Sequence, residues 1–82
     1  MTSGRVLIEL PDLGNVDSTV VVAWLHQVGD AVVEGDDLVE VETEKTTFVI
    51  PAPVTGRLAE IRVVEGCEIA VGEILGAMDR SV

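Results

Sequence analysis

An internal repeat is the feature that most restricts how this chain can fold. The segment GDAVVEGDDL at residues 29–38 matches GCEIAVGEIL at residues 66–75, which begins 37 positions later. Both follow one pattern: glycine, two residues, valine or isoleucine, two residues, glycine, an acid, one residue, leucine. The same offset pairs apolar residues outside these segments, namely Val21 with Leu58, Trp24 with Ile61 and Val41 with Met78. The repeat predicts two similar β half-units related by approximate two-fold symmetry.

Both half-units have the pattern of short β-strands. Valine, isoleucine and threonine dominate the apolar segments, glycine and proline separate them, and no window has the 3.6-residue period of a helix. The segment LVEVET at 38–43 alternates apolar and acidic residues, as a strand with one wet face does. We expect an all-β fold and one domain over 1–82, with strands at 5–10, 19–25, 31–33, 38–43, 46–50, 56–64, 68–70 and 73–79.

Charge excludes two classes of partner. The formal net charge is −10, with fifteen acidic residues against five lysines and arginines. Nucleic-acid binding depends largely on cations at phosphates, and docking on anionic membranes depends on basic patches. No apolar run approaches the roughly 20 residues that a membrane span needs. We therefore expect no nucleic acid and no membrane among the partners, and a basic surface on any protein partner.

Single cysteine and histidine residues restrict the chemistry of the chain. Cys67 has no second cysteine to pair with, which suits a reducing compartment, and His26 is the only histidine. One histidine and one cysteine do not make a metal site, so we expect no metal and no catalytic residue. The N-terminal residues lack the apolar region of a signal peptide. We expect a cytoplasmic bacterial protein, or a mitochondrial-matrix protein if a transit segment has been trimmed.

Lys45 is the only lysine in the chain. It lies between the predicted strands 38–43 and 46–50, at the tip of a tight hairpin that lacks the asparagine or glycine favoured in such turns. Glutamates at positions 42 and 44 and a wet position favour the charged amine, which disfavours a catalytic lysine. A solvated surface charge and a target for covalent modification both remain open. The two-fold symmetry places both chain ends at the pole opposite this lysine.

The residues around Lys45 resemble a known attachment segment. VETEKTTFVIPAPVTG, at 41–56, is similar to the lipoyl-attachment segment of the biotinyl/lipoyl domain family, which commonly reads Glu-Thr-Asp-Lys-Ala followed by Pro-x-Pro-x-x-Gly. That family also has a glycine sixteen residues before the lysine and another eleven after it, at Gly29 and Gly56 here. Biotinyl members have methionine on both sides of the lysine, where this chain has Glu44 and Thr46. The resemblance therefore favours the lipoyl version, as in dihydrolipoyl acyltransferases of the 2-oxo acid dehydrogenase complexes.

This resemblance implies a fold and a function. The fold is a flattened barrel-sandwich of two small antiparallel sheets, with Lys45 on a tight turn. We expect lipoate to be amide-linked to Lys45 by a lipoylating enzyme, and the arm to be reductively acylated by a thiamine-diphosphate-dependent 2-oxo acid dehydrogenase. The acyl group then passes to coenzyme A in an acyltransferase core, and a dihydrolipoamide dehydrogenase reoxidises the arm. The chain is then a carrier and not an enzyme alone. A biotin carboxyl carrier, or an unmodified barrel that only contacts other proteins, is the alternative.

Six further residues receive roles from the resemblance. Four of them flank the lysine and are expected to help the lipoylating enzyme recognise the hairpin: Glu42, Thr43, Glu44 and Thr46. Gly29 and Gly56 are expected to be structural, adopting positive φ angles in turns that fix the hairpin.

Overall fold

The structure, a computed structural model, describes residues 4–14 and 16–81. These residues form eight strands: β1 (Gly4–Glu9), β2 (Thr19–Trp24), β3 (Ala31–Val32), β4 (Asp37–Thr43), β5 (Thr47–Pro51), β6 (Gly56–Ile61), β7 (Glu68–Ile69) and β8 (Ile74–Arg80). The described residues include no helix, and hence no helix that could cross a membrane. The predicted all-β class and each predicted strand are confirmed, with ends that differ by up to three residues.

The largest boundary difference is at β6, which ends at Ile61 and not at residue 64. Here the chain leaves the sheet because Val63 turns into the core, where it is 8% exposed. The Trp24 indole N–H donates a hydrogen bond of 2.8 Å to the Val63 carbonyl. Trp24 itself is partly buried and packs against the core cluster.

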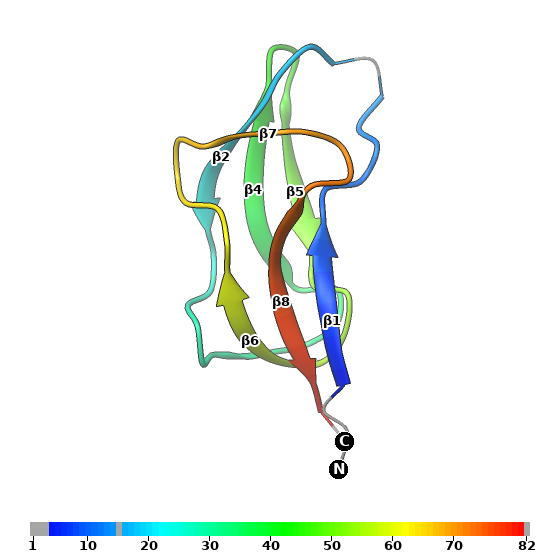
Figure 1. The fold of residues 1–82 in the computed structure, drawn as a ribbon, viewed down its shortest axis with the longest axis vertical. Coiled ribbons are helices and arrows are strands. Elements are labelled where there is room, and N and C mark those ends of the chain that lie inside the picture. The colour runs from blue at the N-terminus through cyan, green and yellow to red at the C-terminus, as the bar shows by residue number, and fades with distance from the viewer. Residues whose placement is uncertain (1–3, 15, 82) are drawn as a thin grey trace.

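Two antiparallel four-stranded sheets make up the fold (Figure 1). Their strand orders are β1-β8-β6-β3 and β5-β4-β2-β7. Exchanging the first four strands with the last four converts one order into the other, so each sheet contains strands of both half-units. The β1-β8-β6-β3 sheet is called sheet A below, and the β5-β4-β2-β7 sheet is called sheet B. The two-fold symmetry predicted from the repeat is therefore a property of the topology.

The symmetry extends to the irregularities of the sheets. The β2–β4 register shifts between Val21 and Ala23, and the β6–β8 register shifts between Leu58 and Glu60, 37 positions later. A second pair of shifts leaves Leu38 and Leu75 outside the regular pairing, again 37 positions apart. Both leucines are 0% exposed. Bulges at equivalent positions bend the equivalent strands in the same way. The bulges at Leu38 and Leu75 also coincide with buried side chains.

One core lies between the sheets. Its buried members come from both half-units and are almost all aliphatic: Ile8, Leu10, Val21, Val32, Leu38, Val39, Val41, Ile50, Ala52, Val54, Leu58, Val63, Ile69, Leu75 and Met78. Small β-branched side chains fill a thin core without the volume that aromatic residues would need.

Gly29 and Gly56, the two glycines predicted to be structural, are required for different reasons. Gly29 has a φ of 98°, so its predicted positive φ is confirmed. Gly56 is not among the positive-φ glycines, and the prediction for it was wrong. It begins β6 opposite Arg80, and a Cβ there would overlap the carbonyl oxygen of Asp79. Gly56 is required by close approach of two strands. Both glycines contact β6 or β8 and not the β4–β5 hairpin.

The β4–β5 hairpin and the ends of the described chain lie at opposite poles of the molecule (Figure 1). The described chain measures 42 × 19 × 19 Å, and the β4–β5 hairpin lies at one end of its long axis (Figure 1). The first and last described strands meet at the other end, where Gly4 pairs with Arg80. The predicted separation of Lys45 from the termini is confirmed.

Candidate functional site

Lys45 is exposed in the turn of residues 44–46 that joins β4 to β5. Thr43, the last residue of β4, closes this turn. Its hydroxyl donates to the Thr46 carbonyl at 2.9 Å and accepts from the backbone N–H groups of Lys45 at 3.1 Å and Thr46 at 3.0 Å. The Thr43 N–H also donates to the Thr46 carbonyl, at 2.8 Å. These bonds fix the backbone that carries the lysine, without the glycine or asparagine that tight hairpins favour.

Thr43 therefore has a structural role that the sequence did not indicate. The residue is only 7% exposed, and its side chain is directed at the turn. Its expected part in recognition by a lipoylating enzyme stays a prediction. The signal that could have revealed the structural role is a threonine three positions before the turn ends, since threonine hydroxyls commonly bond nearby backbone groups.

Replacing Thr43 with valine keeps the shape of the side chain and removes the hydroxyl. The N–H groups of Lys45 and Thr46 then lose their acceptor, so we expect a loss of about 1–3 kcal/mol of unfolding free energy. Amide hydrogen exchange at these two residues should accelerate more than exchange in the core strands. The matched control is Thr47→Val, at an exposed β5 position. Equal exchange rates in the two variants would contradict this role.

Glu44 connects the hairpin to the segment before β2. Its carboxylate accepts the Asp17 N–H at 3.1 and 3.0 Å and the Ser18 N–H at 3.3 Å. The Asp17 bond is the largest cause of a lowered pKa at Glu44, followed by the bond from its own N–H; Ser18 and the charge of Lys45 add to the effect, and burial opposes it. The chain thus uses this glutamate to position residues 17 and 18 beside the lysine.

This contact makes the end of the molecule sensitive to acid. Because the pKa of Glu44 is lower in the folded chain than in the unfolded chain, the contact is stabilising above the unfolded value, about 4.3. It is lost as pH falls through the folded value. We expect the amide shifts of Asp17 and Ser18 to titrate together in NMR spectra, with a midpoint below about 4.3. A Glu44→Gln variant should lack that titration; a midpoint at or above the ordinary glutamate value contradicts the assignment.

The structure places the remaining predicted residues around the same turn or away from it. Glu42 and Thr46 are exposed, and Glu42 faces Thr47 across the β4–β5 pair. Glu42, Glu44, Lys45 and Thr46 therefore lie together at one pole. Gly29 and Gly56 do not belong to that group, since they pack toward β6 and β8.

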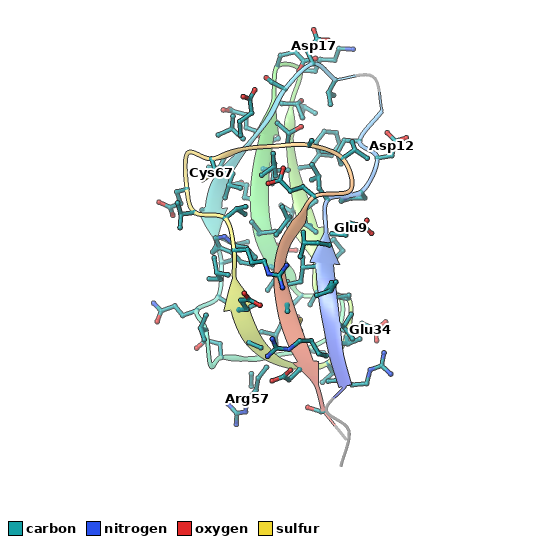
Figure 2. The ribbon with its side chains drawn as sticks, viewed as in Figure 1. Glu9, Asp12, Asp17, Glu34, Arg57 and Cys67 are labelled. Carbon is teal, nitrogen blue, oxygen red and sulfur yellow. The ribbon has the colours of Figure 1, made fainter. Side chains whose placement is uncertain are left out.

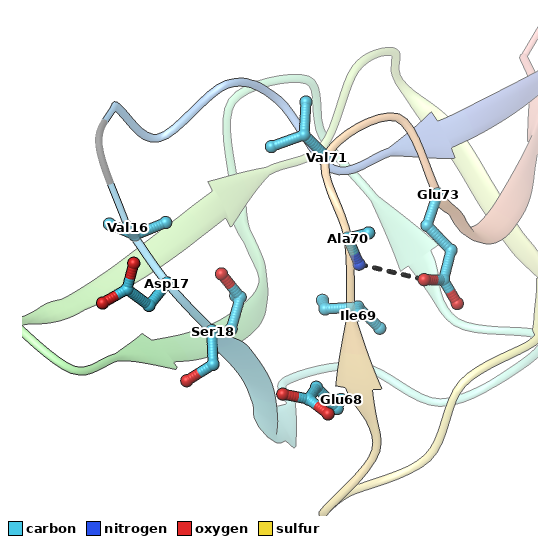
Figure 3. Close-up of a pocket in the computed structure, with 9 residues that line it drawn as sticks. Val16, Asp17, Ser18, Glu68, Ile69, Ala70, Val71 and Glu73 are labelled. Atoms are coloured by element: carbon cyan, nitrogen blue, oxygen red, sulfur yellow. Dashed lines mark hydrogen bonds between the residues drawn. The ribbon is translucent and has the colours of Figure 1, made fainter.

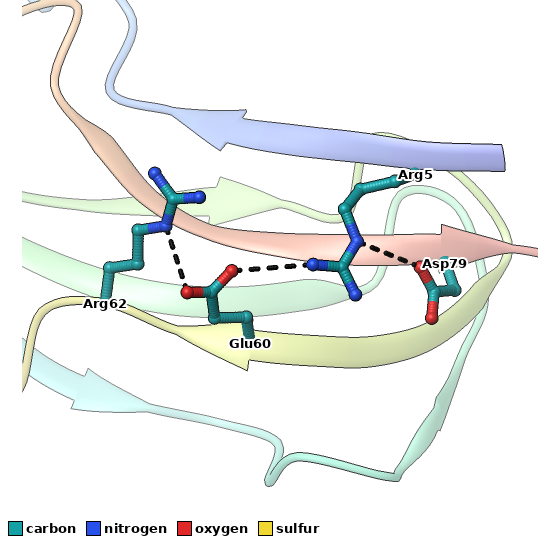
Figure 4. Close-up of polar contacts among 4 residues, drawn as sticks. All are labelled: Arg5, Glu60, Arg62 and Asp79. Atoms are coloured by element: carbon teal, nitrogen blue, oxygen red, sulfur yellow. Dashed lines mark hydrogen bonds and ion pairs between the residues drawn. The ribbon is translucent and has the colours of Figure 1, made fainter. Parts of the chain in front are cut away.

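Arginine residues are concentrated on sheet A. Arg5 on β1 pairs with Asp79 at 3.3 Å and with Glu60 at 3.6 Å, and Glu60 also pairs with Arg62 at 3.1 Å (Figure 4). All these side chains are well exposed, so each pair contributes only about 0–1 kcal/mol. The strands of sheet B contain no lysine or arginine. The two sheets share a backbone plan and differ in surface charge.

Metal-binding chemistry is not indicated by the described part of the chain, where no group of three or more His, Cys, Asp or Glu is arranged to hold an ion. His26 Nδ1 lies 3.7 Å from Asp30, and Cys67 is a partly exposed free thiol whose backbone contacts Val21. Figure 2 shows Cys67 on the segment after β6, away from the pole that carries Asp17. Neither residue joins the hairpin site.

Fold and site define a class: a two-fold symmetric all-β domain that presents one lysine on a rigid β-turn. The chain belongs to the biotin and lipoyl attachment family, since the family model described as "Biotin-requiring enzyme" matches residues 6–78. A solved lipoyl domain of the 2-oxoglutarate dehydrogenase complex from Azotobacter vinelandii has the same fold, with a TM-score of 0.74 and 30% identity. That match covers 89% of this chain and 94% of the other.

Two curated relatives are similar over most of this chain. The succinyltransferase component of the 2-oxoglutarate dehydrogenase complex of Bartonella vinsonii is 41% identical over 73 residues, which is 88% of this chain. The acetyltransferase component of the pyruvate dehydrogenase complex of Staphylococcus aureus (strain Mu50) is 37% identical over 71 residues, or 85% of this chain. The chain spans 18% and 16% of the length of these two relatives. The comparisons confirm the lipoyl-domain class over the biotin alternative.

Proposed function

We propose that this chain is a lipoyl carrier domain in which lipoate is joined by an amide bond to the Nζ atom of Lys45. The observation that carries the proposal is the exposed lysine on a turn fixed by Thr43, at the pole opposite both chain ends. When bound, lipoate supplies a disulfide that takes up an acyl group reductively and delivers it to coenzyme A. An exposed primary amine on an ordered backbone suits amide formation by an external enzyme.

The protein contributes position and recognition. The turn keeps the Lys45 backbone still, so that movement belongs to the long modified side chain. Tethering the arm to a folded domain raises its effective concentration at each enzyme it visits. No residue of the chain is assigned the role of acid, base or nucleophile, because the attached group and the partner enzymes supply those.

Partners follow from this role and from the relatives. The curated relatives are components of 2-oxoglutarate and pyruvate dehydrogenase complexes. We propose a lipoylating enzyme, a thiamine-diphosphate-dependent 2-oxo acid dehydrogenase, an acyltransferase core and a dihydrolipoamide dehydrogenase as partners. The exposed acids Glu42 and Glu44 support recognition by basic surfaces on these proteins. The proposed compartment is the bacterial cytoplasm, or the mitochondrial matrix if a transit segment has been removed.

Lipoate is favoured over biotin by the neighbours of the lysine. Glu44 precedes Lys45 and Thr46 follows it, where biotinyl members of the family have methionines. The solved structure that matches 89% of this chain is a lipoyl domain.

Intact-mass spectrometry tests the proposal directly. The chain is incubated separately with a lipoate ligase and with a biotin ligase, each with ATP and its acid, and the site is located by peptide fragmentation. We expect one lipoyl increment on Lys45 and no biotin increment. The lipoylated chain is then offered to purified pyruvate, 2-oxoglutarate and branched-chain dehydrogenases with their substrates, and one of them should add an acyl group. A chain that accepts neither acid would support the unmodified barrel instead.

A further inference from the structure

The strand β5 is an edge strand of sheet B, and it begins two residues after Lys45. The other strand that holds the lysine turn, β4, lies between β5 and β2, so its backbone groups are engaged on both sides. Of the two hairpin strands, only β5 therefore presents a free backbone edge beside the lysine. A free strand edge is a template on which another chain can add a strand.

The backbone groups of β5 face alternately toward β4 and away from it. The Thr46 carbonyl and the Ala52 N–H both bond toward the β4 side. Even-numbered positions of the strand therefore face β4, and the odd-numbered positions face outward. The outward positions are Thr47, Val49 and Pro51. Proline at the last of these has no N–H to leave unpaired, which is typical of an edge strand.

The equivalent edge strand of sheet A, β1, is protected by charge. Its outward positions are Arg5, Leu7 and Glu9, since the N–H of Leu10 bonds toward the β8 side. Charged side chains along an edge are a common protection against the addition of a strand. In contrast, β5 contains no charged residue. The edge beside the lysine is therefore the less protected of the two.

The outer face of sheet B next to this edge is acidic. Glu40 pairs with Val49, and Glu42 pairs with Thr47. The strands of sheet B contain no lysine or arginine. A strand added to β5 would place alternate side chains on this face, about 10 Å from β4, which is two strand spacings. Lysine and arginine suit that distance, because their long stems can lie along β5 and bring the charge to the glutamates.

We propose that the lipoylating enzyme adds an extended, basic segment to the outer edge of β5 and so holds Lys45 at its active site. This inference rests on the proposed function and deepens it by naming a main-chain contact. Amide formation requires the Nζ atom itself to reach the acyl group on the enzyme, so the enzyme must approach the turn closely. Enzymes that react at the far end of the attached arm do not need this edge. A second copy of the chain is disfavoured as the occupant, since its own β5 brings no cation.

Hydrogen exchange tests the contact without any modification of the chain. The Lys45→Arg chain, which the enzyme cannot consume, is mixed with an excess of lipoate ligase, lipoate and ATP, and exchange is read at single amides. We expect the N–H groups of Thr47 and Val49 to exchange at least about tenfold more slowly with the ligase than without it. The outward amides of β1, at Arg5 and Leu7, should keep their rates. Added salt should weaken the protection, because the segment is basic.

The opposite end of sheet B provides a second control region. There β7 lies at the far end of the strand order from β5, and the segment 68–73 forms one wall of a groove (Figure 3). The Ala70 N–H in this wall donates to Glu73 at 3.0 Å. A strand added to β5 leaves this wall uncovered, so exchange in 68–73 should not change. Protection there equal to that at Thr47 and Val49 would overturn the proposed position of the segment.

Proline substitutions test the same edge through the rate of lipoylation. Val49→Pro removes one outward N–H, and Leu7→Pro removes the N–H at the equivalent position of β1. The two positions are equivalent because their partners, Glu40 and Ala77, are 37 residues apart. We expect Val49→Pro to raise the KM of the chain for lipoate ligase about tenfold and Leu7→Pro to change it by less than about twofold. Val49→Thr keeps the N–H and should also stay within about twofold.

Each outcome supports or removes a stated part of the proposal. Lipoylation of the wild-type chain without protection of Thr47 and Val49 would overturn the added strand and leave the carrier role in place. Equal increases in KM for the two proline variants would also overturn it, because the effect would then be general. Circular dichroism checks that both variants are folded, and the exchange measurement decides if either is not. A wild-type chain that is never lipoylated at Lys45 would remove the carrier role and this inference with it.

Discussion

Replacing Lys45 with arginine should abolish the proposed lipoylation and leave the fold unchanged. Arginine keeps the positive charge, and it is not deprotonated in proteins, so it provides no free amine for amide formation. The turn does not depend on the identity of residue 45, since the bonds that close it join the Thr43 side chain to backbone groups. We expect complete loss of the lipoyl increment in intact-mass spectra, with NMR amide shifts altered only near the turn.

A second variant tests whether the lysine must lie on the hairpin turn. Lys45→Arg/Arg57→Lys moves the one lysine to an exposed position on β6 of sheet A, at constant net charge. That side chain lies in a strand and not at a turn, so we expect the double variant to remain unmodified. A lipoyl increment at position 57 would mean that an exposed amine is sufficient and that its position on the hairpin is not required.

Replacing Gly56 with alanine should have the largest effect on stability. The added Cβ would overlap the Asp79 carbonyl oxygen and lie 2.8 Å from the Asp79 carbonyl carbon. The atoms in the way belong to the backbone of β8, which is paired with β1 and β6 and has little room to move. We expect a loss of about 3 kcal/mol or more of unfolding free energy, which is a large part of the 5–15 kcal/mol available to a typical small domain.

Gly29→Ala provides the comparison for that measurement. A Cβ at Gly29 has nothing within 4 Å, and the cost there comes only from a φ of +98°. Placing a Cβ in such a conformation costs about 1–2 kcal/mol. Urea unfolding followed by circular dichroism measures both variants under the same conditions. If Gly29→Ala is the more damaging of the two, the close approach of β6 and β8 is not the reason for the glycine at position 56.

Much of the fold could be predicted because the internal repeat is visible in the sequence and the fold has the same two-fold symmetry. One offset of 37 residues predicted two equivalent half-units, and the same offset relates the bulges at Leu38 and Leu75. The predicted end of β6 was three residues too late, because the chain turns Val63 into the core after Ile61, where the Val63 carbonyl accepts a hydrogen bond from the Trp24 indole. That bond joins residues 39 positions apart, and local patterns do not report such contacts.

The sequence was sufficient to predict the central residue of the site, Lys45. It was less informative about the contacts that hold the turn in place. Lys45 was identifiable from its scarcity and from the resemblance of residues 41–56 to an attachment segment. The connection from Glu44 to Asp17 and Ser18 joins two segments through a side chain and backbone donors, which leaves no mark on the sequence pattern. Gly56 was assigned the wrong reason, because a glycine needed for φ and a glycine needed for space look alike in a sequence.

The pairing of Gly4 with Arg80 has a consequence for protein engineering. The first and last strands of the domain therefore begin and end side by side, so two adjacent linkers would be enough to connect it to another protein. It could be grafted into a surface loop of an unrelated host without forcing the flanking host residues apart. The modified side chain would then face outward from the host, about as far from the graft point as the long axis of the domain allows.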